Sequence, residues 1–473
     1  MDLLPLVCIL TAGTIGAGLL FVKPRFATWL LIVLSVFDLA FFSRWLGAPR
    51  IVGRLPYIIA FILSIRMSIN YLYRKHQQRY LSKAIANVLF FSGTFFLIFL
   101  FSNTYNAESI ILGFYELRYF FLLATLTFSI LLYIPINISL KNFIKPFVFA
   151  SLVQLPFTIM QHIAVQVLGI NLSTSTDTSL DMVCGTFATY PQLVLLQSIT
   201  IGFVLTYQLS TGKNILKINN YLLMLLIFTT ILLSFSRSSI IFVLLSISIA
   251  LMGKVFKKSK PKIFIRNIAL VVFLPPVCLS LFYTFFWQQH DLSNQLSLKY
   301  VSEYFLRDPL LEHSLKDARM GRGRAAIESV KLAFKDPVTS FIGIGTGAVS
   351  TAQFLGIKGR HYQKYGPLAG VGRSQFSKTM SETGIFGILS TTCYLLFMLI
   401  LAKKVAKQQY SYCFNLFVIL VVVTGLMIFY ANIFQFNITL LIFAYSTVFL
   451  HKSLKNRNYS GYHQMTHKRY KTI

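Results

Sequence analysis

The stretch YCFNLFVILVVVTGLMIFY, residues Tyr412–Tyr430, decides the fold class, because it is almost wholly apolar and contains no charged residue. A helix needs about 20 such residues to cross the roughly 30 Å hydrocarbon core of a membrane. Membrane β-strands are shorter and alternate apolar with polar residues, which this stretch does not do. It therefore predicts a transmembrane helix.

Similar apolar runs recur along the whole chain. Hydrophobic residues make up 55% of the 473 positions and charged residues only 12%, whereas a soluble domain has about 25% charged residues. We predict an all-α integral membrane protein, a bundle of about 12–13 transmembrane helices. The number depends on residues 51–67, a short apolar run between arginines that either spans or lies re-entrant. The predicted spans are 3–22, 26–43, 51–67, 84–102, 116–134, 147–169, 187–209, 220–236, 238–253, 267–286, 379–402, 412–430 and 432–450.

The positive charges concentrate in short tracts at the ends of these spans. A net charge of +30 is compatible with nucleic-acid binding. However, short basic loops are the feature that orients membrane proteins, because these loops face the cytoplasm. We therefore expect no nucleic acid as a partner, membrane lipids around the bundle, and a cytoplasmic C-terminus. The basic tracts are Arg74–Lys83, Lys141–Lys145, Lys213–Lys217, Lys254–Arg266, Lys403–Lys407 and Lys452–Arg457.

One long polar segment interrupts the apolar pattern. It contains half of the chain's 14 acidic residues, and the alternation of loops predicts that it is an extracytoplasmic loop domain with short helices. Long translocated segments escape the positive-inside rule, so its basic residues do not oppose this side. The expected organisation is about ten transmembrane helices in 1–286, the loop domain in 287–378, the last three transmembrane helices in 379–450, and a basic cytoplasmic tail in 451–473.

Within this loop, the spacing of apolar residues predicts a helix over Gly323–Lys335. Asp336 followed by Pro337 should end that helix, because the residue before a proline avoids helical geometry. The glycines of the following GIGTG, residues 343–347, predict an irregular and tightly turning backbone.

Arginines are the main candidates for chemistry. Arg237 lies in SFSRSS between two spans, and a charge at the rim of a bundle is costly and usually functional, although rim arginines also extend to lipid headgroups. Arg319, Arg322 and Arg324 lie within six residues in ARMGRGRAA, and guanidinium groups match phosphate oxygens in two-point contacts. Solvated surface charge is the competing interpretation. Arg118, near a span end, is expected to snorkel or to pair internally.

The next span begins near Arg373, and Glu382 follows nine residues later. We interpret Glu382 as a structural partner for arginine or backbone in preference to a catalytic base, because a carboxylate at a span end needs a partner. His361, in KGRHYQKY, is a minor candidate for the base. No His, Cys or Asp spacing typical of a metal site occurs, so neither a metal nor another cofactor is expected.

Four segments, taken in order, resemble the bacterial O-antigen ligase and O-antigen polymerase superfamily. The resemblance covers about 180 central residues and includes the order of the segments and one long external loop late in the bundle. One departure favours a polymerase over a ligase: Arg373-Ser374 stands where the family often has His-Asn, and that histidine is the usual candidate base in the ligases. The segments are CGTFATYPQLVLLQS (Cys184–Ser198), SFSRSS (Ser234–Ser239), GRGRAAIESVKLAFKDPVTSFIGIGTG (Gly321–Gly347) and RSQFSKTMSETGIFG (Arg373–Gly387).

The resemblance implies a glycosyltransferase that polymerises undecaprenyl-diphosphate-linked oligosaccharides, as in lipopolysaccharide synthesis, on the outer face of the bacterial inner membrane. Both donor and acceptor would be lipid-linked, and a chain-length regulator is an implied protein partner. Arg237, Arg324 and Arg373 would then be catalytic, and the substrate would also contact the residues Arg319, Arg322, His361 and Glu382. Transfer of finished polymer to lipid A-core or another acceptor is the first alternative. A polysaccharide or lipid transporter is the second, although no internal repeat is evident, and a non-catalytic assembly partner is a third.

Overall fold

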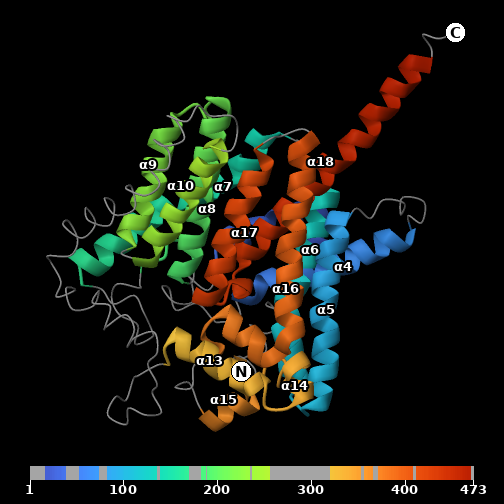
Figure 1. Cartoon of the computed structure of the whole chain (residues 1–473), viewed down its shortest axis with the longest axis vertical. Coiled ribbons are helices and arrows are strands. Elements are labelled where there is room, and N and C mark those ends of the chain that lie inside the picture. Colours follow the sequence, from blue (N-terminus) through green and yellow to red (C-terminus); the bar gives the residue numbers. More distant parts are fainter. Residues whose placement is uncertain are drawn as a thin grey trace.

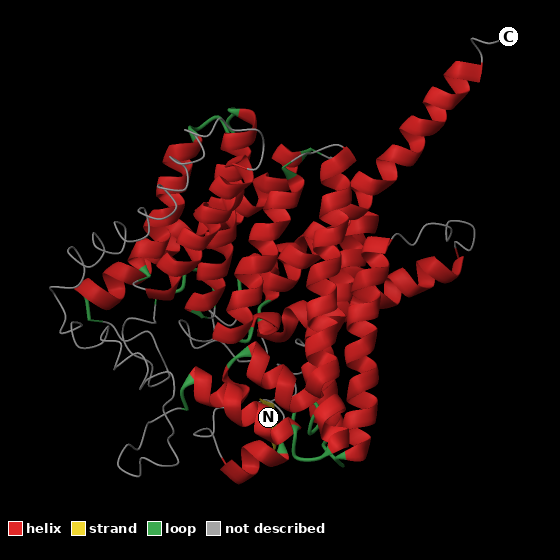
Figure 2. Ribbon diagram, viewed as in Figure 1, coloured by secondary structure: helices red, strands yellow, loops and turns green. Residues whose placement is uncertain are grey.

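A computed structural model of the whole chain shows a bundle of helices (Figure 1). Nearly all of the regular structure in the described part is helical, apart from β1 (Thr351–Ala352) and β2 (Ile357–Lys358), a two-residue antiparallel pair (Figure 2). This agrees with the predicted all-α class. The structure describes residues 16–38, 53–73, 83–135, 139–169, 183–187, 189–234, 237–255, 320–352, 356–365, 371–408 and 412–469.

Six of the described helices are long and apolar enough to cross a membrane, which indicates a multi-pass membrane protein. They are α5 (Lys83–Tyr105), α6 (Ile110–Tyr133), α7 (Leu140–His162, continued by a π-helical turn to Val167), α8 (Tyr190–Thr211), α16 (Gln375–Gln408) and α17 (Cys413–Tyr430). The other helices of the bundle are α2 (Pro24–Val36), α4 (Leu55–Tyr73), α9 (Asn220–Leu233), α10 (Arg237–Val255) and α18 (Asn437–Arg469).

Residues 16–38 are the described part of the two predicted spans, 3–22 and 26–43. A helix over Gly16–Val22 meets α2 at a bend of 112°, so that the pair forms one broken span or a re-entrant loop. Pro24 explains the break, because its ring fixes the backbone at the first turn of α2 and excludes it from the interior of a continuous helix. The predicted span 267–286 and the first part of the predicted loop domain lie outside the described residues.

Helix α8 is the centre of the bundle. Every residue from Pro191 to Tyr207 is buried, which is the pattern of a helix surrounded on all sides. Two of its polar side chains bond to α7: Ser151 of α7 donates to the Thr200 hydroxyl at 2.8 Å, and Gln197 donates to the Ser151 carbonyl at 3.2 Å. Because a buried polar group without a partner is costly, these contacts fix α8 against α7.

The outer surface of the bundle is apolar, as lipid contact requires. Phe90, Leu97 and Phe101 of α5 are more than half exposed, and so are Leu389 and Leu396 of α16. A soluble protein seldom exposes so many large apolar side chains on neighbouring helices. These residues therefore support immersion of the bundle in lipid.

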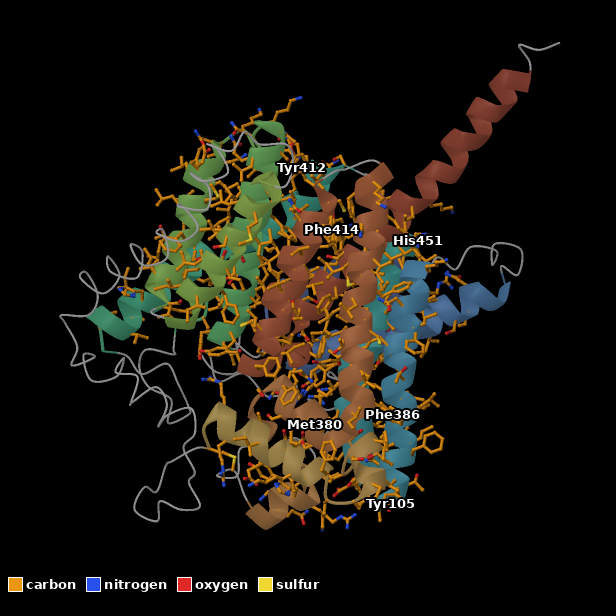
Figure 3. All side chains as sticks on the ribbon, viewed as in Figure 1. Tyr105, Met380, Phe386, Tyr412, Phe414 and His451 are labelled. Carbon is orange, nitrogen blue, oxygen red and sulfur yellow. The ribbon has the colours of Figure 1, made fainter. Side chains whose placement is uncertain are left out.

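A group of short helices, which we call the cap segment (described residues 320–352 and 356–365), lies at one end of the bundle (Figure 1). It comprises α13 (Arg322–Ala333), α14 (Pro337–Ile342) and α15 (Arg360–Tyr365). Tyr105 lies at this end, whereas Tyr412 lies at the opposite end, from which α18 projects (Figure 3). The cap segment and the C-terminal end of α18 thus lie at opposite ends of the bundle.

The first cap helix lies close to the expected Gly323–Lys335. Asp336 then begins α14, because its carboxylate accepts from the Thr339 amide at 2.9 Å and from the Thr339 hydroxyl. These bonds also lower the pKa of Asp336 below its usual range, since they favour the ionised form.

The glycine-rich loop that follows α14 attaches the cap segment to the turn between α5 and α6. Gly343, Gly345 and Gly347 all have positive φ angles, which favour glycine. Asn103 brackets Thr346: its side-chain oxygen accepts from the Thr346 amide at 2.7 Å, and its side-chain nitrogen donates to the Thr346 carbonyl at 3.0 Å. The predicted irregular backbone is therefore a specific docking loop.

We predict that Asn103→Ala destabilises the protein by about 1–3 kcal/mol for each Thr346 backbone group that it leaves buried without a partner. Thermal unfolding of the purified protein in detergent measures this loss. Thr104→Ala is the matched control, because Thr104 is exposed and bonds only to the carbonyl of Leu100 within its own helix. Equal unfolding temperatures for the two variants would contradict the docking role of Asn103.

Candidate functional site at the cap-side end of the bundle

The turn between α17 and α18, residues 430–436, joins segments that are far apart in the sequence. The amide of Gln375, at the start of α16, donates to the carbonyl of Ala431 at 3.1 Å. The side chain of Asn432 donates to the carbonyl of Gly372 at 2.7 Å. The segment that begins with Arg373-Ser374 is thereby fixed to the cap-side end of α17.

Tyr430, the last residue of α17, brings in the other segments. Arg322 donates from Nε to the Tyr430 carbonyl at 2.9 Å, and its guanidinium carbon lies 4.1 Å from the centre of the Tyr430 ring. The Tyr430 ring also meets Phe242 of α10 and Tyr190 of α8 edge to face, at 6.1 and 6.3 Å, and the two tyrosine hydroxyls are hydrogen-bonded. The starts of α8, α10 and α13 therefore converge on one ring.

The Cys-Gly-Thr start of the first segment is a buried loop with a structural role. Gln161 of α7 accepts from the amides of Cys184 and Gly185 at 2.9 and 2.8 Å. Gln154, about two helical turns earlier, accepts from the Thr186 amide at 2.8 Å. Gly185 has a φ of +65°, and a Cβ there would lie 2.3 Å from the Gln154 side-chain oxygen. These residues shape the approach to Tyr190.

The predicted arginines are placed differently from one another. Arg324 forms an ion pair with Glu328 of its own helix at 3.1 Å, so part of its charge is compensated there. Arg237 begins α10 and Arg373 lies in a 3₁₀ turn before α16, but their side chains lie outside the described residues. Arg319 lies outside them altogether. Of the two described arginines of the cluster, Arg322 lies at the convergence of helices and Arg324 pairs within its own helix.

Glu382 joins α16 to the glycine-rich loop. Its carboxylate accepts from the Ser350 hydroxyl at 2.8 Å and from the amide of Gly347. Two residues later, Gly384 (φ +61°) breaks the helical geometry of α16, and a Cβ there would lie 2.7 Å from the amide nitrogen of Gly343. These contacts are those of a structural partner for the backbone.

A buried ion pair that the sequence analysis missed lies beside Glu382. Lys378 Nζ contacts Glu116 Oε2 at 2.5 Å, and both side chains are less than one-tenth exposed. Lys378 precedes Glu382 by one helical turn, so the ammonium lies on the same face of α16 as the second carboxylate. Glu116, Lys378 and Glu382 line one cavity of about 30 Å³, which is large enough for about one water molecule. It is lined by Phe95, Glu116, Tyr119, Phe120, Thr346, Gln375, Lys378, Thr379, Glu382, Thr383, Phe434 and Gln435.

One wall of this cavity, Tyr119, belongs to a group of tyrosines around Arg118. The Arg118 guanidinium carbon lies 3.5 Å from the Tyr115 ring centre and 4.1 Å from the Tyr119 ring centre. Arg118 also donates to the Tyr115 carbonyl and the Tyr119 hydroxyl. Arg118 is therefore held within the protein.

His361 lies on α15, at the outer edge of the cap segment (Figure 1). Its neighbour Arg360 bonds to Glu108 at the start of α6 at 3.1 Å, which ties α15 to the bundle. Among the residues that the structure describes, no group of three His, Cys, Asp or Glu side chains is arranged to hold a metal ion.

Comparison of the sequence with protein-family models gives no match, and comparison with curated proteins gives none. The functional assignment therefore depends on the arrangement of the chain's own residues.

We predict that Lys378→Met destabilises the protein by about 3–5 kcal/mol, because it leaves the Glu116 carboxylate buried without its partner. The double variant Glu116→Gln/Lys378→Met should recover much of this loss, since it removes both charges. Thermal unfolding in detergent measures both effects.

Lys331→Met is the matched control. Lys331 pairs with Glu328 at 2.9 Å on the exposed side of α13, and exposed pairs contribute at most about 1 kcal/mol. A double variant no more stable than Lys378→Met alone would show that the buried charges do not compensate one another.

Proposed function

We propose that the protein is a membrane-embedded glycosyltransferase that polymerises polyprenyl-diphosphate-linked oligosaccharides at the outer face of the bacterial inner membrane. One observation supports this most: residues of three motif segments, and α10, the helix that begins in the fourth (SFSRSS), meet around the α17–α18 turn. The contacts run through Tyr190, Phe242, Arg322 and Gln375. A polymerase needs such a site at the membrane surface, where the lipid tail stays in the bilayer and the sugars lie in water.

The reaction requires stabilisation of a departing diphosphate. A hydroxyl of the acceptor sugar attacks the anomeric carbon of the donor sugar, and the bond from that carbon to the diphosphate oxygen breaks. Guanidinium groups suit this leaving group, because they form two-point contacts with phosphate oxygens and stabilise developing negative charge. We assign this role to Arg322 and Arg237, and we place Arg373 near a sugar or the acceptor.

The proton of the acceptor hydroxyl must pass to another group. Arg373 does not accept it, because the pKa of an arginine lies above about 12. Glu382 is buried, and its carboxylate is held by Ser350 and the glycine-rich loop, as expected for a structural partner. We propose that the proton passes to solvent, because the diphosphate leaves readily and help from a general base is typically worth only about 10²–10⁴-fold.

The buried charges also suit a second function, a transporter for lipid-linked sugars. Glu116, Lys378 and Glu382 lie within membrane-spanning helices, and ionisable side chains at such depth often belong to proton or ion pathways. A ligase that transfers finished polymer to another acceptor remains the alternative within the enzyme class.

Gel analysis of surface polysaccharide from a deletion strain separates these functions. For a polymerase, the ladder should collapse to a single capped repeat and return when the gene is restored. Long polymer that stays unattached would instead indicate a ligase, and loss of every surface unit, including the single repeat, would indicate a transporter.

In the same strain, we predict that Arg237→Ala abolishes the ladder and that Arg237→Lys is also poor, because lysine retains the charge but not the fork of donors. Arg322→Ala should lower polymer yield by about 10- to 100-fold, as expected for a hydrogen bond to a charged group. Lys335→Ala, which removes an exposed cation at the other end of the cap helix, is the control. A wild-type ladder from Arg237→Ala protein at normal membrane levels would remove Arg237 from the site.

The sidedness of the chain gives a separate prediction. A cysteine at Lys331, on the cap segment, should react with a membrane-impermeant reagent in spheroplasts, whereas one at Lys404 should react only after lysis, because short basic loops face the cytoplasm. Native cysteines are replaced first. Protection of the cap-segment cysteine would overturn the orientation and the proposed function with it.

A further inference from the structure

Tyr430 contacts Arg322 in two independent ways, through its carbonyl oxygen and through its ring. We propose that Tyr430 is a positioning residue: it holds the Arg322 guanidinium at the meeting point of α8, α10 and α13 for contact with a diphosphate. This inference rests on the proposed function, in which Arg322 binds the leaving group. It adds a role for a residue that belongs to none of the four motif segments.

The carbonyl contact follows from the end of α17. A helix leaves its last four carbonyls without partners inside the helix. The backbone becomes extended at Ala431 (φ −147°, ψ 166°), so the Tyr430 carbonyl points away from any following helical turn. Arg322 supplies the missing donor, and a cation is also favoured at the negative end of a helix dipole.

The same contact compensates for an unfavourable position on α13. Arg322 is the first residue of that helix, and a cation at the positive end of a dipole is disfavoured. The residue that caps this helix, Gly321, has no side chain that could accept a hydrogen bond from the first turn. Placing the C-terminal end of α17 against the start of α13 offsets this cost, so that Arg322 keeps one orientation.

The ring contact is itself fixed from two sides. Tyr190 bonds to the Tyr430 hydroxyl and packs against its edge, while Phe242 meets the ring from α10. A long arginine side chain loses up to about 2 kcal/mol of rotamer entropy when a ligand immobilises it. A ring that already holds the guanidinium removes part of that cost before the diphosphate arrives.

The test is a double-mutant cycle on the full-length protein in lipid nanodiscs, with inorganic diphosphate affinity measured by calorimetry. Tyr430→Leu should weaken diphosphate binding by about 3- to 30-fold, the range of a cation–π contact. Arg322→Ala/Tyr430→Leu should bind no more weakly than Arg322→Ala alone, because the tyrosine acts through the arginine. Tyr430→Phe keeps both ring and carbonyl and should bind like the wild type.

Phe429→Leu is the matched control, because Phe429 stacks on Phe376 at 4.8 Å and none of the arginines whose side chains the structure describes lies over its ring. Its effect on affinity should be absent or additive with Arg322→Ala. No diphosphate binding by the wild type, an additive Tyr430→Leu effect, or a Tyr430→Phe loss as large as an Arg322→Ala loss would each overturn the inference. The comparison of Tyr430→Phe with Arg322→Ala still tests the inference if the Tyr430→Leu variant does not fold.

Turnover of a lipid-linked donor, measured on the same preparations, tests the proposed function separately. If the enzyme turns over the donor but the effects of Arg322→Ala and Tyr430→Leu are additive, the positioning role of Tyr430 is wrong and the glycosyltransferase function stands. A non-additive cycle without turnover would leave an anion site positioned by Tyr430 in a protein of another function.

Discussion

Backbone groups in loops and at a helix end, paired by distant side chains, determine how the cap-side end of this protein is built. In a membrane protein such groups must be paired internally, because lipid offers neither donors nor acceptors. Arg322 pairs the Tyr430 carbonyl, Asn103 pairs both groups of Thr346, and Gln161 pairs the amide and the carbonyl of Gly185. Each of these side chains lies far from its partner in the sequence. Pairing of these loop and helix-end groups therefore joins segments that are separated in the sequence.

The buried charges follow the same rule at higher cost. Removing Glu116 and Lys378 from water is expensive, and their mutual attraction repays this only with good geometry and further hydrogen bonds. Their contact at 2.5 Å and the additional bond from Gln435 to Glu116 meet that condition. The pair joins α6 to the first turns of α16, the part that precedes the break at Gly384. The short segment after Arg373 is thus fixed at both its start and its middle, which a site built on it requires.

Sequence alone was sufficient where one segment determines its own structure. The apolar run 412–430 became α17, Cys413–Tyr430, and the stripe expected over Gly323–Lys335 became α13, Arg322–Ala333. Two features of the bundle left no local pattern. The break at Gly384 lies inside a predicted span, and the glycine alone does not specify it, because it depends on the close approach of Gly343. The other is the ion pair of Lys378 and Glu116, because a contact between distant segments has no periodicity along the chain.

Tyr430 shows the same limit for the site. It looked like the end of a span, and only the packing of α8, α10 and α13 around it gives it another role. Arg322 and Arg324 likewise looked equivalent in sequence. They differ because the helical period places Glu328 one turn after Arg324, whereas Arg322 meets a different helix.

The packing of the centre also bears on the choice between an enzyme and a transporter. A transporter needs a route that opens toward both ends of the bundle. Here α8 is buried from Pro191 to Tyr207, and two of its polar side chains, Gln197 and Thr200, bond to Ser151 of α7. The cavity beside Lys378 has room for about one water, far less than a sugar needs. Moving a sugar through the described bundle would require unpacking its most buried helix, whereas a reaction at the cap-side end requires only lateral approach of the lipid. The arrangement therefore favours chemistry at the membrane surface.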